Sequence, residues 1–89
     1  MRKIELDLRQ MTSVPALHKH LFKMLGLPKY YGCNLDALHD CLTEMVEQTE
    51  IVVPAQVTDE KYLGAYGEGL MQVFEDSADE NESLKITVK

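Results

Sequence analysis

Residues 27–47, with the sequence LPKYYGCNLDALHDCLTEMVE, join a loop that contains two tyrosines and a glycine to a segment with helical periodicity. Asn34 is a suitable N-cap, because its side-chain oxygen can accept a free backbone N–H of the first turn. Asp36 follows where the helix dipole favours a negative charge. The apolar residues recur at helical spacing and comprise Leu35, Leu38, Leu42, Met45 and Val46, with Cys41 at their border. The stretch therefore predicts an amphipathic helix that packs on a core.

The opposite side of this predicted helix is polar and mostly acidic. It carries Asp36, His39, Asp40, Thr43 and Glu47, and Glu44 extends it. A solvated outer face is the ordinary interpretation of such a pattern. Two features favour a binding surface instead. A helix without another role gains from Lys or Arg in its last turns, whereas residues 30–60 contain neither. Tyr30 and Tyr31 also lie beside the charged surface, as aromatic residues often do at protein interfaces.

Negative charge is concentrated in residues 30–84 of the chain. The 89 residues carry a net charge of −6, but residues 30–84 contain 13 acidic residues and a single base, Lys61. Such a surface repels nucleic acids and anionic membranes, since both present phosphates that it would meet without countercharge. We therefore expect a basic protein as the partner, with no nucleic acid and no membrane.

The residues before the central stretch predict a strand followed by a helix. Ile4, Leu6 and Leu8 alternate with polar residues, as in a strand with one buried face. A helix follows, with Thr12 or Ser13 as its N-cap, and Gly26 and Pro28 end it. Its core side comprises Val14, Leu17, Leu21, Met24 and Leu25. His18 and His20 are two residues apart and point to different sides, so we expect both at the surface and not as metal ligands.

The residues after the central stretch predict a second and a third strand with helices between them. Residues 50–53 form a β-branched run that Pro54 ends, which indicates a strand buried on both faces. We expect a short helix over residues 55–63, closed by Gly64, and then a longer helix whose start is loosened by Gly67 and Gly69. Its apolar side comprises Tyr66, Leu70, Val73, Phe74 and Ala78, and the last strand contains Leu84, Ile86 and Val88. This order predicts an α/β fold with a three-stranded parallel sheet, in a single domain of residues 1–89.

The longer helix ends in a second cluster of acidic residues, which are Glu75, Asp76, Asp79 and Glu80, with Glu82 just beyond. Glu75 with Asp79 and Asp76 with Glu80 are like-charge i,i+4 pairs. Each pair costs about 0.2–0.5 kcal/mol and also opposes the helix dipole. Two acidic helix faces in one small chain favour a shared role in binding.

The segment LPKYYGCNLDALHDCLTE resembles the signature of the barstar family, the intracellular protein inhibitors of barnase-type secreted ribonucleases. The order and spacing of the flanking elements, including GLMQVFEDSADE near the C-terminus, extend the resemblance over most of the chain. It implies a barstar-like fold with a three-stranded parallel sheet and packed helices. It also implies a protein without enzymatic activity or cofactor, which binds a basic ribonuclease 1:1 and covers its active site with residues 27–47.

The resemblance also implies which residues contact the ribonuclease. Asp40 would be central, its carboxylate standing in the place of a substrate phosphate, and Tyr31 would support the loop. The full set of expected partner-binding residues is Tyr30, Asn34, Asp36, His39, Asp40, Thr43, Glu44, Asp76 and Glu80.

The sequence departs from the family pattern at several of these positions. His39 stands where the best-known member has a tryptophan, Glu44 replaces a glycine, and Cys33 stands where a glutamate is common. The chain contains no tryptophan at all. Because an exposed histidine becomes charged near pH 6.5, His39 predicts inhibition that weakens as the pH falls through about that value.

Two other function classes stay open from the sequence. Cys33 precedes a helix N-terminus, which can lower a thiol pKa and would suit an enzyme. However, His39 and Cys41 are two residues apart on a helix and cannot face each other. No phosphate-binding loop or metal-spaced cluster appears, so we expect no enzyme and no metal. The other class is an acidic adaptor or regulatory module with the same fold, which binds another basic protein.

The sequence further suggests a monomer in the cytoplasm. Residues 1–8 do not resemble a signal peptide, and no apolar run approaches the roughly 20 residues of a membrane span. Cys33 and Cys41 are expected to be about 10 Å or more apart at their Cα atoms, which is too far for a disulfide. Free thiols fit a reducing compartment.

Overall fold

A computed structural model describes residues 1–89, and it has a three-stranded parallel sheet as expected. The strands are β1 (Arg2–Glu5), β2 (Thr49–Val53) and β3 (Leu84–Val88), and they lie in the order β1-β2-β3. In the register of the sheet, Ile4 of β1 pairs with Ile51 of β2, and Ile51 pairs with Ile86 of β3. The prediction of an α/β fold with a three-stranded parallel sheet is confirmed.

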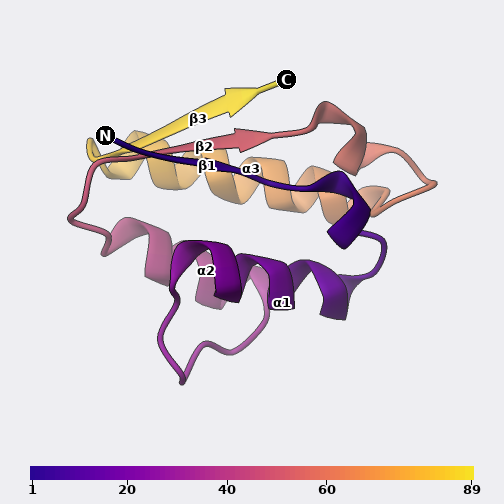
Figure 1. Cartoon of the computed structure of the whole chain (residues 1–89), viewed down its shortest axis with the longest axis horizontal. Helices are drawn as coiled ribbons and strands as arrows, with labels where there is room; N and C mark the ends of the chain where they lie inside the picture. The colour runs from indigo at the N-terminus through magenta and orange to yellow at the C-terminus, as the bar shows by residue number, and fades with distance from the viewer.

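Three α-helices pack with this sheet: α1 (Val14–Leu25), α2 (Leu35–Thr43) and α3 (Ala65–Glu80). Short 3₁₀ helices, η1 (Leu8–Gln10) and η2 (Ala55–Thr58), follow β1 and β2. Figure 1 shows α3 next to the strands and α1 and α2 farther from them, with the loop between α1 and α2 projecting away from the sheet. None of the helices combines the length and apolar character that a membrane span requires.

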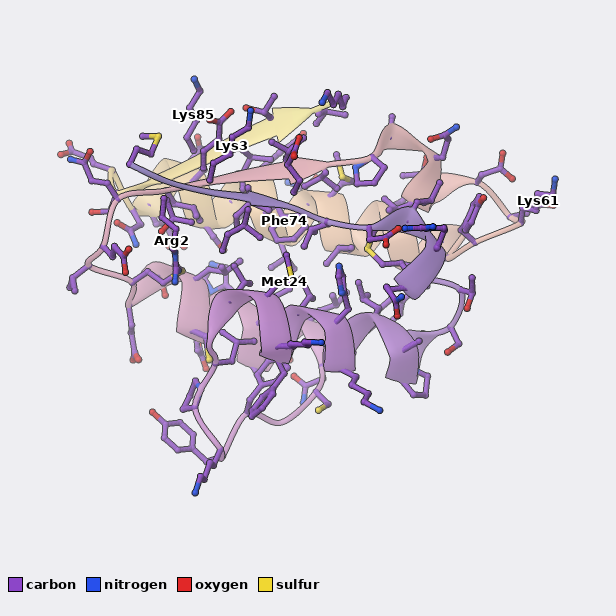
Figure 2. The ribbon with its side chains drawn as sticks, in the orientation of Figure 1. Arg2, Lys3, Met24, Lys61, Phe74 and Lys85 are labelled. Carbon is purple, nitrogen blue, oxygen red and sulfur yellow. The ribbon has the colours of Figure 1, made fainter.

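The helices share one core with a single face of the sheet. The core contains the inward residues Ile4, Ile51 and Leu84 together with Leu17 and Leu21 of α1, Leu38 and Leu42 of α2, and Leu70 and Phe74 of α3. Lys3 and Lys85 flank Glu50 in the register of the sheet and point away from the helices (Figure 2). Cations and a carboxylate therefore compensate one another across this part of the outer face. Val52 lies on the same outer face and is only 5% exposed, so β2 is buried on both faces at this position.

The ends of α1 follow the local sequence signals. The Ser13 side chain accepts a hydrogen bond from the backbone N–H of Ala16, and Gly26 ends the helix in the left-handed conformation with φ 64°. A residue with a Cβ atom is strained at this φ, which explains the glycine. The expected position of Val14 in the core is wrong, because Val14 lies at the first turn and is exposed.

The expectation that His18 is a surface residue is wrong, because its side chain is only 1% exposed. His18 precedes Leu21 by three residues and Leu25 by seven, so helical spacing places it on the buried side of α1. His20 is half-buried, and its Nε2 accepts a hydrogen bond from the backbone N–H of Asp7 at 3.0 Å.

Two boundaries after the central helix differ from the sequence prediction. α2 ends at Thr43, so Val46 lies beyond it and is 90% exposed instead of buried in the core. Residues 55–63 form η2 and a series of turns instead of one short helix. Gly67 is buried, and a Cβ atom there would lie 2.0 Å from the carbonyl oxygen of Val57. Its role is therefore to allow η2 to approach α3, and not to loosen the start of that helix.

Candidate functional site

The loop between α1 and α2, residues 26–34, places its two tyrosines on opposite sides. Tyr30 is 82% exposed, whereas Tyr31 is buried in the core. The backbone N–H of Tyr31 donates to the carbonyl of Pro28 at 2.9 Å, and the Asn34 side chain donates to the carbonyl of Gly32 at 3.2 Å. These bonds fold the loop on itself, so that Tyr30 is presented to solvent while Tyr31 holds the loop to the protein.

His18 connects this loop to two helices. Its Nδ1 lies 2.5 Å from the hydroxyl of Tyr31, and its Nε2 lies 2.6 Å from the hydroxyl of Tyr66 in the first turn of α3. A neutral imidazole has one donor and one acceptor nitrogen, so it satisfies both hydroxyls. Burial lowers the pKa of His18 and raises that of Tyr31, which keeps both groups neutral. The loop is therefore fixed to α1 and α3 by one buried hydrogen-bonded chain.

No pattern in the sequence predicted this bridge. The helical position of His18 on the buried side of α1 indicates that its two ring nitrogens need polar partners, because buried polar groups are almost always hydrogen-bonded. The identity of those partners depends on residues 13 and 48 positions away in the sequence. Spacing rules within one helix cannot provide such contacts.

The acidic residues of α2 form an exposed row beside the loop. Asp36, Asp40 and Glu44 recur every four residues, and all three are exposed. Asp40 and Glu44 also line a hollow of about 340 Å³ together with Tyr30, Tyr31, Gly32, Ala37 and Cys41. Burial, reinforced by the charges of Glu44 and Asp40, raises the pKa of the Cys41 thiol. The structure thus brings Tyr30, Asp40 and Glu44 together around one hollow with a negative field.

The start of α2 is fixed by Asn34, whose side-chain oxygen accepts a hydrogen bond from the backbone N–H of Ala37 at 2.7 Å. The end of α2 is fixed by a residue for which the sequence contains no signal. Asn81, just after α3, donates from its side chain to the carbonyls of Leu42 at 2.9 Å and Met45 at 2.8 Å. Both termini of this short helix are therefore capped by asparagine side chains, one local and one distant in the sequence.

A second contact joins the acidic ends of α2 and α3. His39 Nε2 lies 2.6 Å from Glu80 Oε2, so two expected partner-binding residues contact each other. Asp76 lies one turn earlier on α3 and is exposed, and its carboxylate accepts a hydrogen bond from Gln72 at 2.9 Å.

The side chains of Asn34 and Thr43, two further expected contact residues, already form hydrogen bonds within the chain. The Thr43 hydroxyl lies within donor distance of the carbonyls of His39 at 3.0 Å and Asp40 at 3.1 Å. Asn34 is exposed and Thr43 is half-buried. Both therefore help to shape the backbone that carries Asp40.

The structure does not assemble a metal site or a reactive thiol pair. No group of three or more His, Cys, Asp or Glu side chains is arranged to hold a metal ion. Cys33 and Cys41 are both free. Cys33 is exposed in the loop and adopts the left-handed conformation with φ 55°.

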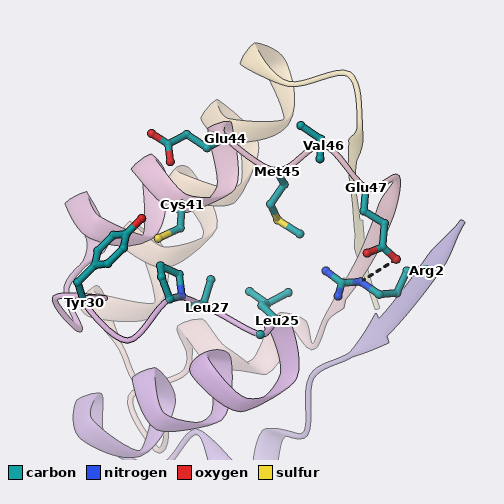
Figure 3. A pocket seen from close by; sticks show the side chains of 11 residues that line it. Arg2, Leu25, Leu27, Tyr30, Cys41, Glu44, Met45, Val46 and Glu47 are labelled. Carbon is teal, nitrogen blue, oxygen red and sulfur yellow. Dashed lines mark ion pairs between the residues drawn. The ribbon is translucent and has the colours of Figure 1, made fainter.

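A further hollow of about 450 Å³, drawn in Figure 3, shares Tyr30, Cys41 and Glu44 with the first. It lies between the end of α1 with the start of the loop on one side and the segment after α2 on the other. Its lining residues are Arg2, Leu25, Gly26, Leu27, Pro28, Tyr30, Cys41, Glu44, Met45, Val46 and Glu47. Arg2 Nε lies 3.8 Å from Glu47 Oε1, as the dashed line in Figure 3 marks, and the Arg2 guanidinium points from there towards the middle of the hollow.

The chain is similar in sequence to known proteins of one family. The family described as barstar (barnase inhibitor) matches residues 1–89, which is the whole chain. The chain is also 35% identical over 91 residues to a protein of Bacillus subtilis (strain 168) named "Putative ribonuclease inhibitor YrdF", with the alignment covering 100% of both chains. The family match and this relative agree with the three-stranded parallel sheet and its packed helices. The chain therefore belongs to the barstar family.

Proposed function

We propose that this protein inhibits a barnase-type ribonuclease by covering the active site of the enzyme with the loop of residues 26–34 and α2. The observation that carries the proposal is the exposed carboxylate of Asp40 in a hollow beside the exposed ring of Tyr30. The family description as barnase inhibitors and the name of the Bacillus subtilis relative support a ribonuclease as the partner.

Asp40 suits the replacement of an RNA phosphate. A ribonuclease binds the phosphates of its substrate with cationic side chains, and a carboxylate accepts paired hydrogen bonds from the same guanidinium and ammonium groups. The Asp40 carboxylate projects from a helix whose two ends are capped by Asn34 and Asn81. Little conformational freedom is therefore lost when the enzyme binds, and this favours affinity.

The acidic residues around Asp40 enlarge the negative surface that a basic enzyme would meet. Asp36 and Glu44 lie one turn to either side of Asp40, and Asp76 and Glu80 lie on the adjacent α3. Exposed charges of this kind attract a basic enzyme over distances comparable with the Debye length, which is about 10 Å at 0.1 M salt and about 3 Å at 1 M. Inhibition should therefore weaken with ionic strength.

In this proposal the inhibitor is a monomer that acts 1:1 in the cytoplasm and has no enzymatic activity of its own. Cys33 and Cys41 are free, which fits a reducing compartment.

The test is a titration of purified barnase with the intact protein, Asp40→Ala and the control Glu60→Ala, each at low and at moderate salt. Glu60 is an exposed acid that forms no side-chain hydrogen bond or ion pair, so its variant changes the charge by the same amount at a different place. Removing one partner of a buried charge pair costs about 3–5 kcal/mol, which corresponds to a loss of affinity of about a hundredfold to several thousandfold.

Stoichiometric inhibition by the intact protein and by Glu60→Ala, with a large loss for Asp40→Ala, supports the proposal. Equal losses for both variants would show that only the overall charge matters, and they would favour an acidic adaptor over an active-site inhibitor.

A further inference from the structure

The two hollows beside α2 are separated by a ridge that belongs to both. Tyr30, Cys41 and Glu44 line the hollow around Asp40, and they also line the larger hollow of about 450 Å³ that Figure 3 shows. A protein that contacts Tyr30, Cys41 and Glu44 therefore lies against both hollows. The two hollows form one continuous surface.

The second hollow has an apolar lining. Leu25 and Leu27 are buried at its base, and Met45 is half-buried on the side of α2. Val46 stands at its rim and is 90% exposed, and Tyr30 is 82% exposed. Exposed apolar side chains gathered around a hollow are typical of a surface that another molecule covers.

The rim of this hollow is acidic. Glu44 and Glu47 both line it. Arg2, the only cation among the lining residues, lies next to Glu47 and points its guanidinium into the hollow on the side away from Glu44 (Figure 3). Glu44 has no ion-pair partner within the chain. Lys and Arg side chains place their methylene groups on apolar surface and keep the charged group at its edge. Such a side chain therefore fits a hollow with an apolar base and the unpaired Glu44 carboxylate at its rim.

We propose that the second hollow binds a lysine or arginine side chain of the same ribonuclease, with Glu44 receiving the cationic head and Val46 covering the stem. This inference rests on the proposed function, because it takes the enzyme already bound at Asp40 as the source of the side chain. Glu44 and Val46 would then determine which basic ribonuclease this protein prefers.

The test measures the dissociation constant of the barnase complex for Val46→Ser and Glu44→Gln. Val88→Ser and Glu60→Gln are the controls, since Val88 is an exposed valine at the end of β3 and Glu60 an exposed glutamate far from α2 in the sequence. Val46 and Glu44 are both exposed, so all four variants should fold, which thermal unfolding verifies. We expect a loss of affinity of about 5- to 10-fold for each hollow variant and less than twofold for each control.

A scan of the basic residues of barnase to Ala identifies the bound side chain. In the enzyme variant that lacks this side chain, Glu44→Gln should cause no further loss, whereas Asp40→Ala should still weaken binding. If Asp40→Ala weakens inhibition while Val46→Ser and Glu44→Gln behave as their controls, the hollow is not a docking site, although the proposed function stands.

A second measurement does not depend on inhibition of barnase. Nuclear magnetic resonance titration with Nα-acetyl-arginine amide should shift the backbone signals of Leu27, Met45 and Val46 and saturate at millimolar concentrations. Glu44→Gln should weaken this binding severalfold. If the signals do not shift, or shift equally with the uncharged Nα-acetyl-glutamine amide, the proposal is wrong, whatever the outcome with barnase.

Discussion

The bridge from His18 to the two tyrosines can be tested by removing one hydroxyl. Tyr66→Phe deletes the oxygen that lies 2.6 Å from His18 Nε2 and leaves the aromatic ring in place. The rings of His18 and Tyr66 are in edge-to-face contact with centroids 5.9 Å apart, and phenylalanine can keep this packing. The variant therefore isolates the hydrogen bond from the apolar contact.

The expected cost follows from the burial of the imidazole. His18 is 1% exposed, so water has little access to the nitrogen that loses its partner. An unsatisfied buried polar group costs about 1–3 kcal/mol. For a domain of this size, each kcal/mol lowers the Tm by about 4–8 °C.

Urea unfolding at pH 7.5, where His18 is neutral, measures this cost. Tyr62→Phe is the matched control, because it removes a hydroxyl of a half-buried tyrosine that forms no hydrogen bond in the structure. We expect a loss of about 1–3 kcal/mol for Tyr66→Phe and little change for Tyr62→Phe. Equal losses for the two variants would refute the bridge as a stabilising element.

Three further predictions concern stability. Folding stability should fall as the pH decreases below the ordinary histidine pKa of about 6.5, because burial lowers the pKa of His18 in the folded protein and the unfolded chain therefore binds the proton first. His18→Gln should flatten this part of the pH profile in urea unfolding, and an unchanged slope would contradict the assignment. Gly67→Ala should cost more than about 3 kcal/mol or prevent folding, because the added Cβ would lie 2.0 Å from the Val57 carbonyl oxygen; near-normal thermal unfolding would show that η2 can move away. Asn81→Ala should cost about 1–3 kcal/mol, since the carbonyl of Leu42 loses a partner at 2.9 Å, and an unaltered Tm would show that α2 does not need this cap.

The sequence predicted the elements whose signals are local. Asn34 and Gly26 mark the start of α2 and the end of α1 through contacts within four or five residues. The period-2 and β-branched patterns identified the strands, although β1 ends at Glu5 and Leu8, expected in that strand, begins η1. The alternation of strands with helices indicated the parallel sheet. These signals succeed because capping and periodicity depend on neighbours in the chain.

The errors occur where distant residues decide the structure. Periodicity extended the central helix to Val46, whereas the helix ends at Thr43 and the chain then turns towards β2, with Asn81 bound to the freed carbonyls. His18 was expected at the surface because it lies two residues from His20 and the two point to different sides, although two tyrosines from other segments satisfy it in the core. Neither contact has a signature within its own element.

In the candidate site, too, local features could be predicted and contacts between distant residues could not. The acids of α2 and the exposed Tyr30 could be identified from spacing and from the family resemblance. The contact between His39 and Glu80 could not, because it depends on how α2 and α3 pack. The hollow beside Val46 could not be predicted either, since the expected helix would have placed that valine in the core.

The central claim, that Asp40 and the adjacent loop occupy the active site of the ribonuclease, is tested most directly by competition. The apparent dissociation constant of the barnase complex is measured with increasing concentrations of a mononucleotide that binds the active site. If the inhibitor occupies the phosphate-binding groups, the apparent constant should rise in proportion to 1 + [nucleotide]/Kd, by about elevenfold at ten times the nucleotide Kd. An apparent constant that does not change with nucleotide would place the contact outside the active site and contradict the account.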